Sequence, residues 1–140
     1  MAITWSAALE TGHRQIDLQH QELVVLINEL TAALDARLPL TAVDNILPRL
    51  NGYVLFHFGT EEMLMSGLPA ESRHAAAHCQ AHRDFSKRIE ALQQQVANGE
   101  RPDLEPLAAY LLGWLTDHIM NTDRELVALL APRSPAPPLR

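Results

Sequence analysis

Apolar residues recur every three or four positions through most of this chain, which is the period of one face of an α-helix. Proline and glycine divide this pattern into four blocks, at about residues 16–36, 41–66, 70–97 and 103–130. Within the first block, Leu23, Ile27, Leu30 and Leu34 form a single stripe. The alternation of a β-strand is nearly absent. The pattern therefore predicts four long helices.

Local signals mark the expected ends of these helices. Thr41 followed by Asp44 resembles a capping box, with Asp in place of the usual Glu. Pro48 lies inside the second block and predicts either a kink or a later start of that helix. Asn98-Gly99 is a typical helix end, and Asp103 is the expected N-cap of the fourth helix.

The short connections force neighbouring helices to run antiparallel. The expected fold is thus all-α, an up-down-up-down four-helix bundle. An N-terminal arm of about 15 residues precedes it, and a proline-rich segment, residues 131–140, follows it. Because proline disfavours helix, we expect this segment to be a disordered tail. The predicted domain spans residues 1–130.

Composition and charge narrow the class of protein. The chain has 140 residues, 47% of them hydrophobic, which suits one globular domain. A formal charge of -6 argues against nucleic acid or an anionic membrane as partner. A single cysteine, Cys79, excludes an intrachain disulfide and favours a reducing compartment. With neither a signal peptide nor a membrane span recognisable, we expect a cytoplasmic protein.

Seven polar residues interrupt the apolar faces of the predicted helices: His20, His57, Glu61, His78, His82, His118 and Asp123. Two pairs are spaced by four, which puts both side chains on one helix face, about 6 Å apart along the axis. The spacing of five between His118 and Asp123 misses that face by about 140°, so Asp123 is expected to approach from the side. Burying such groups unpaired costs several kcal/mol, and clustered His and carboxylate are typical metal ligands.

The alternating direction of the helices places all seven residues at one end of the bundle. Their number exceeds what one zinc ion needs. Five imidazoles, two bridging carboxylates and a bridging oxide or hydroxide supply about eleven of the twelve or so bonds that two octahedral ions require. One position stays open. An imidazole-rich site favours iron, although ligand type alone also admits copper or zinc.

The segments GHRQIDLQHQEL, HFGTEEML, HCQAHRDF and WLTDHIMNTDREL resemble the hemerythrin family, in its single-domain bacterial form. The resemblance extends from Trp5 to about Leu130. It implies a non-heme di-iron centre that binds O2 reversibly. The protein would then be an oxygen-binding protein for storage, delivery or sensing, and not an enzyme.

The resemblance also implies a role for each site residue. One iron would be held by His78, His82 and His118, and the other, which keeps the open position, by His20 and His57. Glu61 and Asp123 would bridge the two ions. Trp114, Leu115 and Ile119 correspond to the apolar wall around bound O2.

Several neighbouring residues do not match a ligand position. His74 and His78 have the same spacing as His78 and His82, but the RDF that follows His82 favours the latter pair. His13 is expected to be exposed or to cap a loop. Cys79 points about 100° away from His78 and is expected to be a buried or half-buried thiol. Glu62 either faces solvent or supports a ligand from outside.

Three other functions compete with reversible O2 binding. A ferritin-like di-iron enzyme would need paired Glu-x-x-His strings with partner glutamates. The strings that begin at Glu10 and Glu71 lack that set. A peroxidase- or oxidase-type reaction at the same site is a second alternative. A sensor of O2 or nitric oxide that acts through a protein partner is the third. We expect a monomer, and the sequence does not indicate a protein partner.

Overall fold

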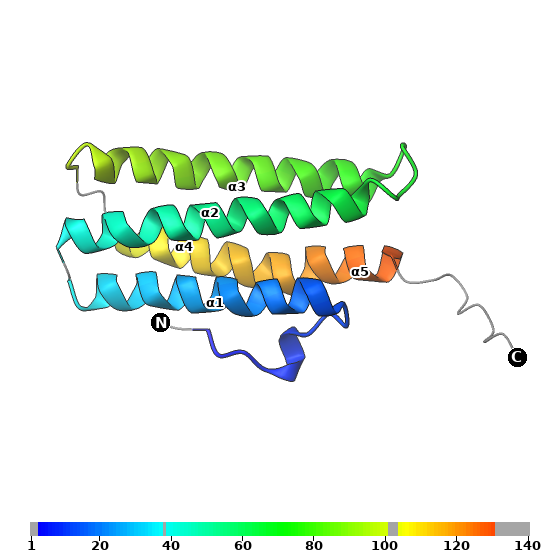
Figure 1. Ribbon diagram of the computed structural model, residues 1–140, viewed down its shortest axis with the longest axis horizontal. Coiled ribbons are helices and arrows are strands. Elements are labelled where there is room, and N and C mark those ends of the chain that lie inside the picture. The colour runs from blue at the N-terminus through cyan, green and yellow to red at the C-terminus, as the bar shows by residue number, and fades with distance from the viewer. Residues whose placement is uncertain (1–2, 38, 101–103, 131–140) are drawn as a thin grey trace, which may run out of the picture.

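Four rods of helix lie side by side and alternate in direction in the computed structural model (Figure 1). The structure describes residues 3–37, 39–100 and 104–130. The first three rods are α1 (Arg14–Asp35), α2 (Leu40–Met65) and α3 (Arg73–Ala97). The fourth combines α4 (Leu104–Asp117), the π-helix η2 (His118–Asp123) and α5 (Arg124–Leu130). The predicted antiparallel four-helix bundle is confirmed, while Asp103 and the tail at 131–140 lie outside the described residues.

Apolar side chains fill the space between the rods. Fully buried examples, one from each rod, are Leu23, Leu47, Ile89 and Leu111. The N-terminal arm, which contains the short 3-10 helix η1 (Ala7–Leu9), runs beside α1 (Figure 1). Two hydrogen bonds between the backbone of Ile3 and the amide of Asn28 fasten it there, at 2.9 and 2.8 Å. Within the described ranges, no helix is both long and apolar enough to cross a membrane.

Helix α2 departs from the predictions at its start. It begins at Leu40 after Pro39, with no side-chain cap, so Thr41 already lies in the first turn and the capping box with Asp44 is wrong. The helix continues through Pro48, so the alternative of a later start is also wrong. Pro48 lacks the N–H that would bond the Asp44 carbonyl. Both residues are exposed, so water can reach that carbonyl.

Helix α3 has well-defined signals at both ends. It begins three residues later than predicted, where the Ser72 hydroxyl accepts a hydrogen bond from the Ala75 N–H at 3.1 Å. At its other end Gly99 adopts a φ of +79°, and the Glu100 N–H bonds the Gln95 carbonyl at 3.0 Å. This is a Schellman ending, which favours glycine at the left-handed position. The predicted stop at this glycine is confirmed.

Candidate metal centre

The seven polar residues identified from the sequence converge at the end of the bundle where α5 lies. They come from all four rods: His20 from α1, His57 and Glu61 from α2, His78 and His82 from α3, and His118 and Asp123 from η2. Each is at most 3% exposed. The antiparallel arrangement therefore brings together residues up to 103 positions apart in the sequence.

The π-helix η2 brings Asp123 to the centre. A π-helix closes i→i+5 hydrogen bonds, so five residues complete about one turn. His118 and Asp123 therefore project from the same face, and Asp123 Oδ1 lies 2.8 Å from His118 Nε2. The expectation of an ordinary helix here, with Asp123 approaching from the side, is wrong because the rod widens locally by one residue. Such turns occur frequently at functional sites.

The donor atoms form two overlapping groups. One group contains Glu61, His78, His82, His118 and Asp123. The other contains His20, His57, Glu61 and Asp123. Within each group all donor atoms lie within 4.8 Å of one another. Glu61 and Asp123 belong to both groups, so the two carboxylates connect the two sets of histidines.

Distances between the imidazole nitrogens fit a metal ion. His118 Nε2 lies 3.1 Å from His78 Nε2 and 3.2 Å from His82 Nε2. A metal–imidazole bond is about 2.1 Å long, so two ligands at right angles lie about 3 Å apart. His57 Nε2 and Glu61 Oε2 are buried without a hydrogen-bond partner. Unpaired buried polar atoms are costly, and a shared cation would satisfy them. The donor set therefore fits a metal.

The electrostatics of the centre also favour a cation. Burial alone would raise the pKa of Glu61, but hydrogen bonds from His118, His78 and His82 lower it to about 2. The pKa of Asp123 is also well below its usual range, because the charge of His118 outweighs burial. Burial would lower the pKa of His118, but the charge of Asp123 raises it to about 9. Without metal both carboxylates are thus ionised and His118 carries a proton. An incoming cation that binds His118 must displace that proton.

A buried amide orients one of the histidines. His57 Nδ1 lies 2.7 Å from Gln19 Oε1, so an Nδ1–H donates to the amide and leaves Nε2 for the centre. The Gln19 amide donates in turn to Thr60 Oγ1 at 3.1 Å. Gln19 is 5% exposed and was missed in the sequence analysis. The sequence could have indicated its burial, because Gln19 is a polar residue on the same helix face as the apolar residues Ile16 and Leu23.

The residues predicted to form the apolar wall lie beside the centre or in the core. The Trp114 ring stacks on His118, with ring centroids 4.3 Å apart and planes at 14°. It also stacks on Phe85 at 4.0 Å. Leu115 and Ile119 are buried in the main apolar core. Their role as the wall of a ligand pocket stays a prediction.

The remaining residues singled out from the sequence lie outside both donor groups. His13 is half-buried and caps helix α1, not a loop as expected: its Nδ1 accepts a hydrogen bond from the Ile16 N–H at 3.3 Å. Cys79 is half-buried in a small apolar cluster, as expected, and burial raises the pKa of its thiol. His74 belongs to neither group and contacts His78 from outside, at 2.9 Å.

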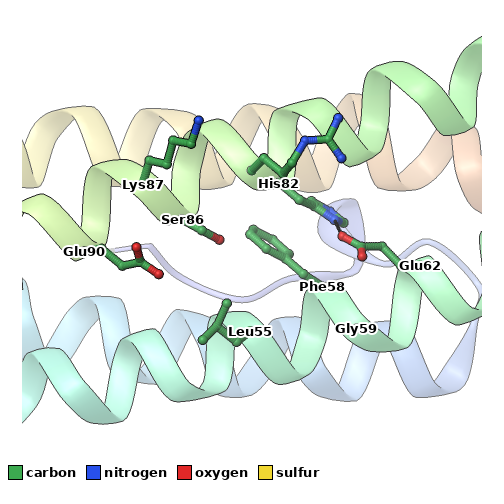
Figure 2. Close-up of a pocket in the computed structure, with 9 residues that line it drawn as sticks. Leu55, Phe58, Gly59, Glu62, His82, Ser86, Lys87 and Glu90 are labelled. Carbon is green, nitrogen blue, oxygen red and sulfur yellow. Dashed lines mark hydrogen bonds and ion pairs between the residues drawn. The ribbon is translucent and has the colours of Figure 1, made fainter.

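Glu62 is partly exposed to solvent and also contacts His82. Its Oε2 lies 3.0 Å from His82 Nδ1, while its side chain is 45% exposed. On the other side, the Phe58 ring stacks on His82 at 3.7 Å. Glu62, His82 and Phe58 line one end of a pocket of about 400 Å³ between α2 and α3 (Figure 2). The outer edge of His82 thus lies close to the surface.

Comparison with known proteins is decisive for the family. A model of the hemerythrin HHE cation binding domain matches residues 11–130. The chain belongs to the hemerythrin family. It is 33% identical to bacteriohemerythrin of Pseudomonas aeruginosa over 121 residues, which cover 86% of this chain and 76% of that protein. It is 31% identical to bacteriohemerythrin of Stenotrophomonas maltophilia over 124 residues, 87% of this chain and 77% of the relative.

Solved hemerythrin structures share the fold. Crystal structures of two hemerythrin mutants match with TM-scores of 0.83 and 0.82, at 26% and 27% identity. Each match covers 94% of this chain and 100% of the other. The hemerythrin family supports an oxygen-binding protein, and the buried His and carboxylate cluster is consistent with iron.

Proposed function

We propose that this hemerythrin binds O2 reversibly at a pair of iron ions, for storage, delivery or sensing of oxygen. The observation that carries the proposal is that Glu61 and Asp123 are shared between two buried histidine groups. His78, His82 and His118 would hold one ion, and His20 and His57 the other, while Glu61 and Asp123 would contribute to both. An oxide or hydroxide would complete the pair, and the side with two histidines would then keep one open position for O2.

The chain's own residues make this position selective for a small gas. When bound, the iron pair supplies electrons that O2 can take up and return. The ligand side chains are almost fully buried, so bulk water is kept away from the centre. Trp114, Leu115 and Ile119 provide an apolar wall beside it. The four rods of the bundle hold the donor side chains in place around the centre.

The open position also suits nitric oxide, and sensing of either gas through a protein partner is the main alternative. Peroxide would fit as well, which makes a peroxidase- or oxidase-type reaction the other alternative. We propose a monomer in the cytoplasm. The lone Cys79 supports this location, since a reducing compartment suits a free thiol.

An optical experiment tests reversible binding. Protein loaded with ferrous iron without air should be nearly colourless, gain an absorption band in air and lose it when O2 is removed. Asp123→Asn should weaken or abolish the band because it changes a shared carboxylate. Asp84→Asn, which alters an exposed carboxylate on α3, should leave the band intact. A single irreversible oxidation of the unaltered protein would contradict the proposal.

A further inference from the structure

In the larger donor group, two histidines are connected through their outer ring nitrogens to carboxylates, one directly and one through another histidine. His82 Nδ1 lies 3.0 Å from Glu62 Oε2, and Figure 2 shows Glu62 beside the His82 ring. His78 is connected to Glu125 through the imidazole of His74. Its Nδ1 lies 2.9 Å from His74 Nε2, and His74 Nδ1 lies 2.8 Å from Glu125 Oε1. Both connections lead from the buried centre to the protein surface.

The positions of the hydrogens in the longer connection follow from the geometry. His78 Nε2 faces the centre, so a metal-binding His78 carries its hydrogen on Nδ1. That N–H donates to His74 Nε2, which leaves His74 Nδ1–H to donate to Glu125. Side-chain exposure rises along this path, from 0% at His78 to 8% at His74 and 65% at Glu125. Each ring is thereby held in one orientation and one tautomer.

The other side of the centre has no such support. His57 Nδ1 donates to the neutral amide of Gln19, and His20 Nδ1 is buried without a hydrogen-bond partner. Hydrogen bonds to a carboxylate are stronger than those to a neutral acceptor. A carboxylate also draws the hydrogen outward and makes the opposite nitrogen a better donor to a metal. The two sides of the centre are therefore unequal.

We propose that Glu62 directly, and Glu125 through His74, make the three-histidine side the stronger metal site, so that the two sites fill in order. This inference rests on the proposed two-metal function. All three are positioning residues. Glu62 and His74 contact the proposed ligands His82 and His78, and Glu125 acts through His74. Loss of such a partner weakens metal binding by about ten- to hundredfold. The number of ions bound at saturation should stay at two.

Cobalt titration of the metal-free protein tests this order. Wild-type protein should show two unequal binding constants by visible absorption with a competing chelator. His57→Ala, which disables the two-histidine side, should keep the tighter constant. In the His57→Ala background, His74→Phe keeps a ring but removes the nitrogen that accepts from the His78 N–H. It should weaken cobalt binding at the three-histidine side by about ten- to hundredfold. Glu125→Gln should produce a smaller loss, because an amide can still accept.

Two controls separate metal affinity from folding. Glu90→Gln removes a carboxylate from α3 that Figure 2 shows at the opposite end of the pocket from His82, and it should change neither constant. In otherwise wild-type protein, Gln19→Leu should weaken the second constant and spare the first. The melting temperature of each metal-free variant reports its folding. A lower melting temperature with unchanged metal affinity would reduce His74 to a structural role and overturn the inference.

The remaining outcomes are also distinct. The inference fails if His74→Phe and Glu125→Gln leave the remaining constant unchanged in the His57→Ala background. It also fails if, in otherwise wild-type protein, these variants weaken the looser of the two constants and spare the tighter one. In either case reversible O2 binding by the wild-type protein would still uphold the proposed function. Conversely, ordered binding of two ions without reversible O2 binding would uphold the inference and overturn the function.

Discussion

Metal loading is expected to stabilise this protein strongly. The centre joins side chains from α1, α2, α3 and η2, so the complete set of donors exists only in the folded state. At free metal a hundredfold above Kd, each ion adds about 2.7 kcal/mol to the free energy of unfolding, or about 5 kcal/mol for two. The unfolding entropy of roughly 120 ordered residues is about 0.25 kcal/mol/K, so the melting temperature should rise by about 20 °C.

Thermal unfolding followed by circular dichroism measures this shift. Protein loaded with ferrous iron without air is compared with chelator-treated protein in the same buffer. Glu61→Gln combined with Asp123→Asn should lose most of the shift, because both shared carboxylates are altered. Equal melting temperatures with and without iron would refute a buried centre that spans the four rods. A shift that persists in the double variant would refute the assignment of these two residues.

Three further changes have specific expected outcomes. Metal analysis should find well below two irons per chain in His118→Ala. His74→Ala should still bind two ions at saturating metal. The opposite result would mean that His74 and His78, and not His78 and His82, are the ligand pair of α3. Trp114→Ala should lower the free energy of unfolding by about 3 kcal/mol in denaturant titration, since the ring stacks on His118, and Trp114→Phe should recover much of it. In metal-free protein, His118 has a pKa raised to about 9 from 6.5. Its stabilising contribution is therefore complete below pH 6.5 and lost as pH rises through 9, so the melting temperature should fall across that range. A flat profile there would contradict the ion pair with Asp123.

The helical layout could be predicted because its signals are local. Apolar spacing identified the rods, and Asn98-Gly99 marked an end because glycine tolerates the left-handed backbone that Gly99 adopts. The capping box failed for an equally physical reason. Pro39 starts α2 without a side-chain cap, so Thr41 falls inside the first turn. Helix starts read from the sequence are uncertain by one or two residues, which is the difference between Pro39 and Thr41 here.

The centre was predictable to the extent that ordinary helical geometry applied. A spacing of four correctly put His78 and His82 on one face. The position of Asp123 was not predictable in this way, because the widened turn depends on tertiary contacts that a periodicity does not contain. The partners of the outer ring nitrogens depend on contacts between rods as well. His74 and Glu125 are 51 positions apart, and neither alone suggests the other.

The wide turn at His118–Asp123 has a practical consequence for transplanting this site. A designed bundle with ideal helices has no room for the extra residue, so copying HIMNTD unchanged would rotate its last carboxylate out of place. A designer must either import the bulge with its surroundings or shorten the segment by one residue, which restores a spacing of four on a regular helix. Sequence searches for metal ligands spaced by three or four residues on a helix would likewise miss the spacing of five between His118 and Asp123.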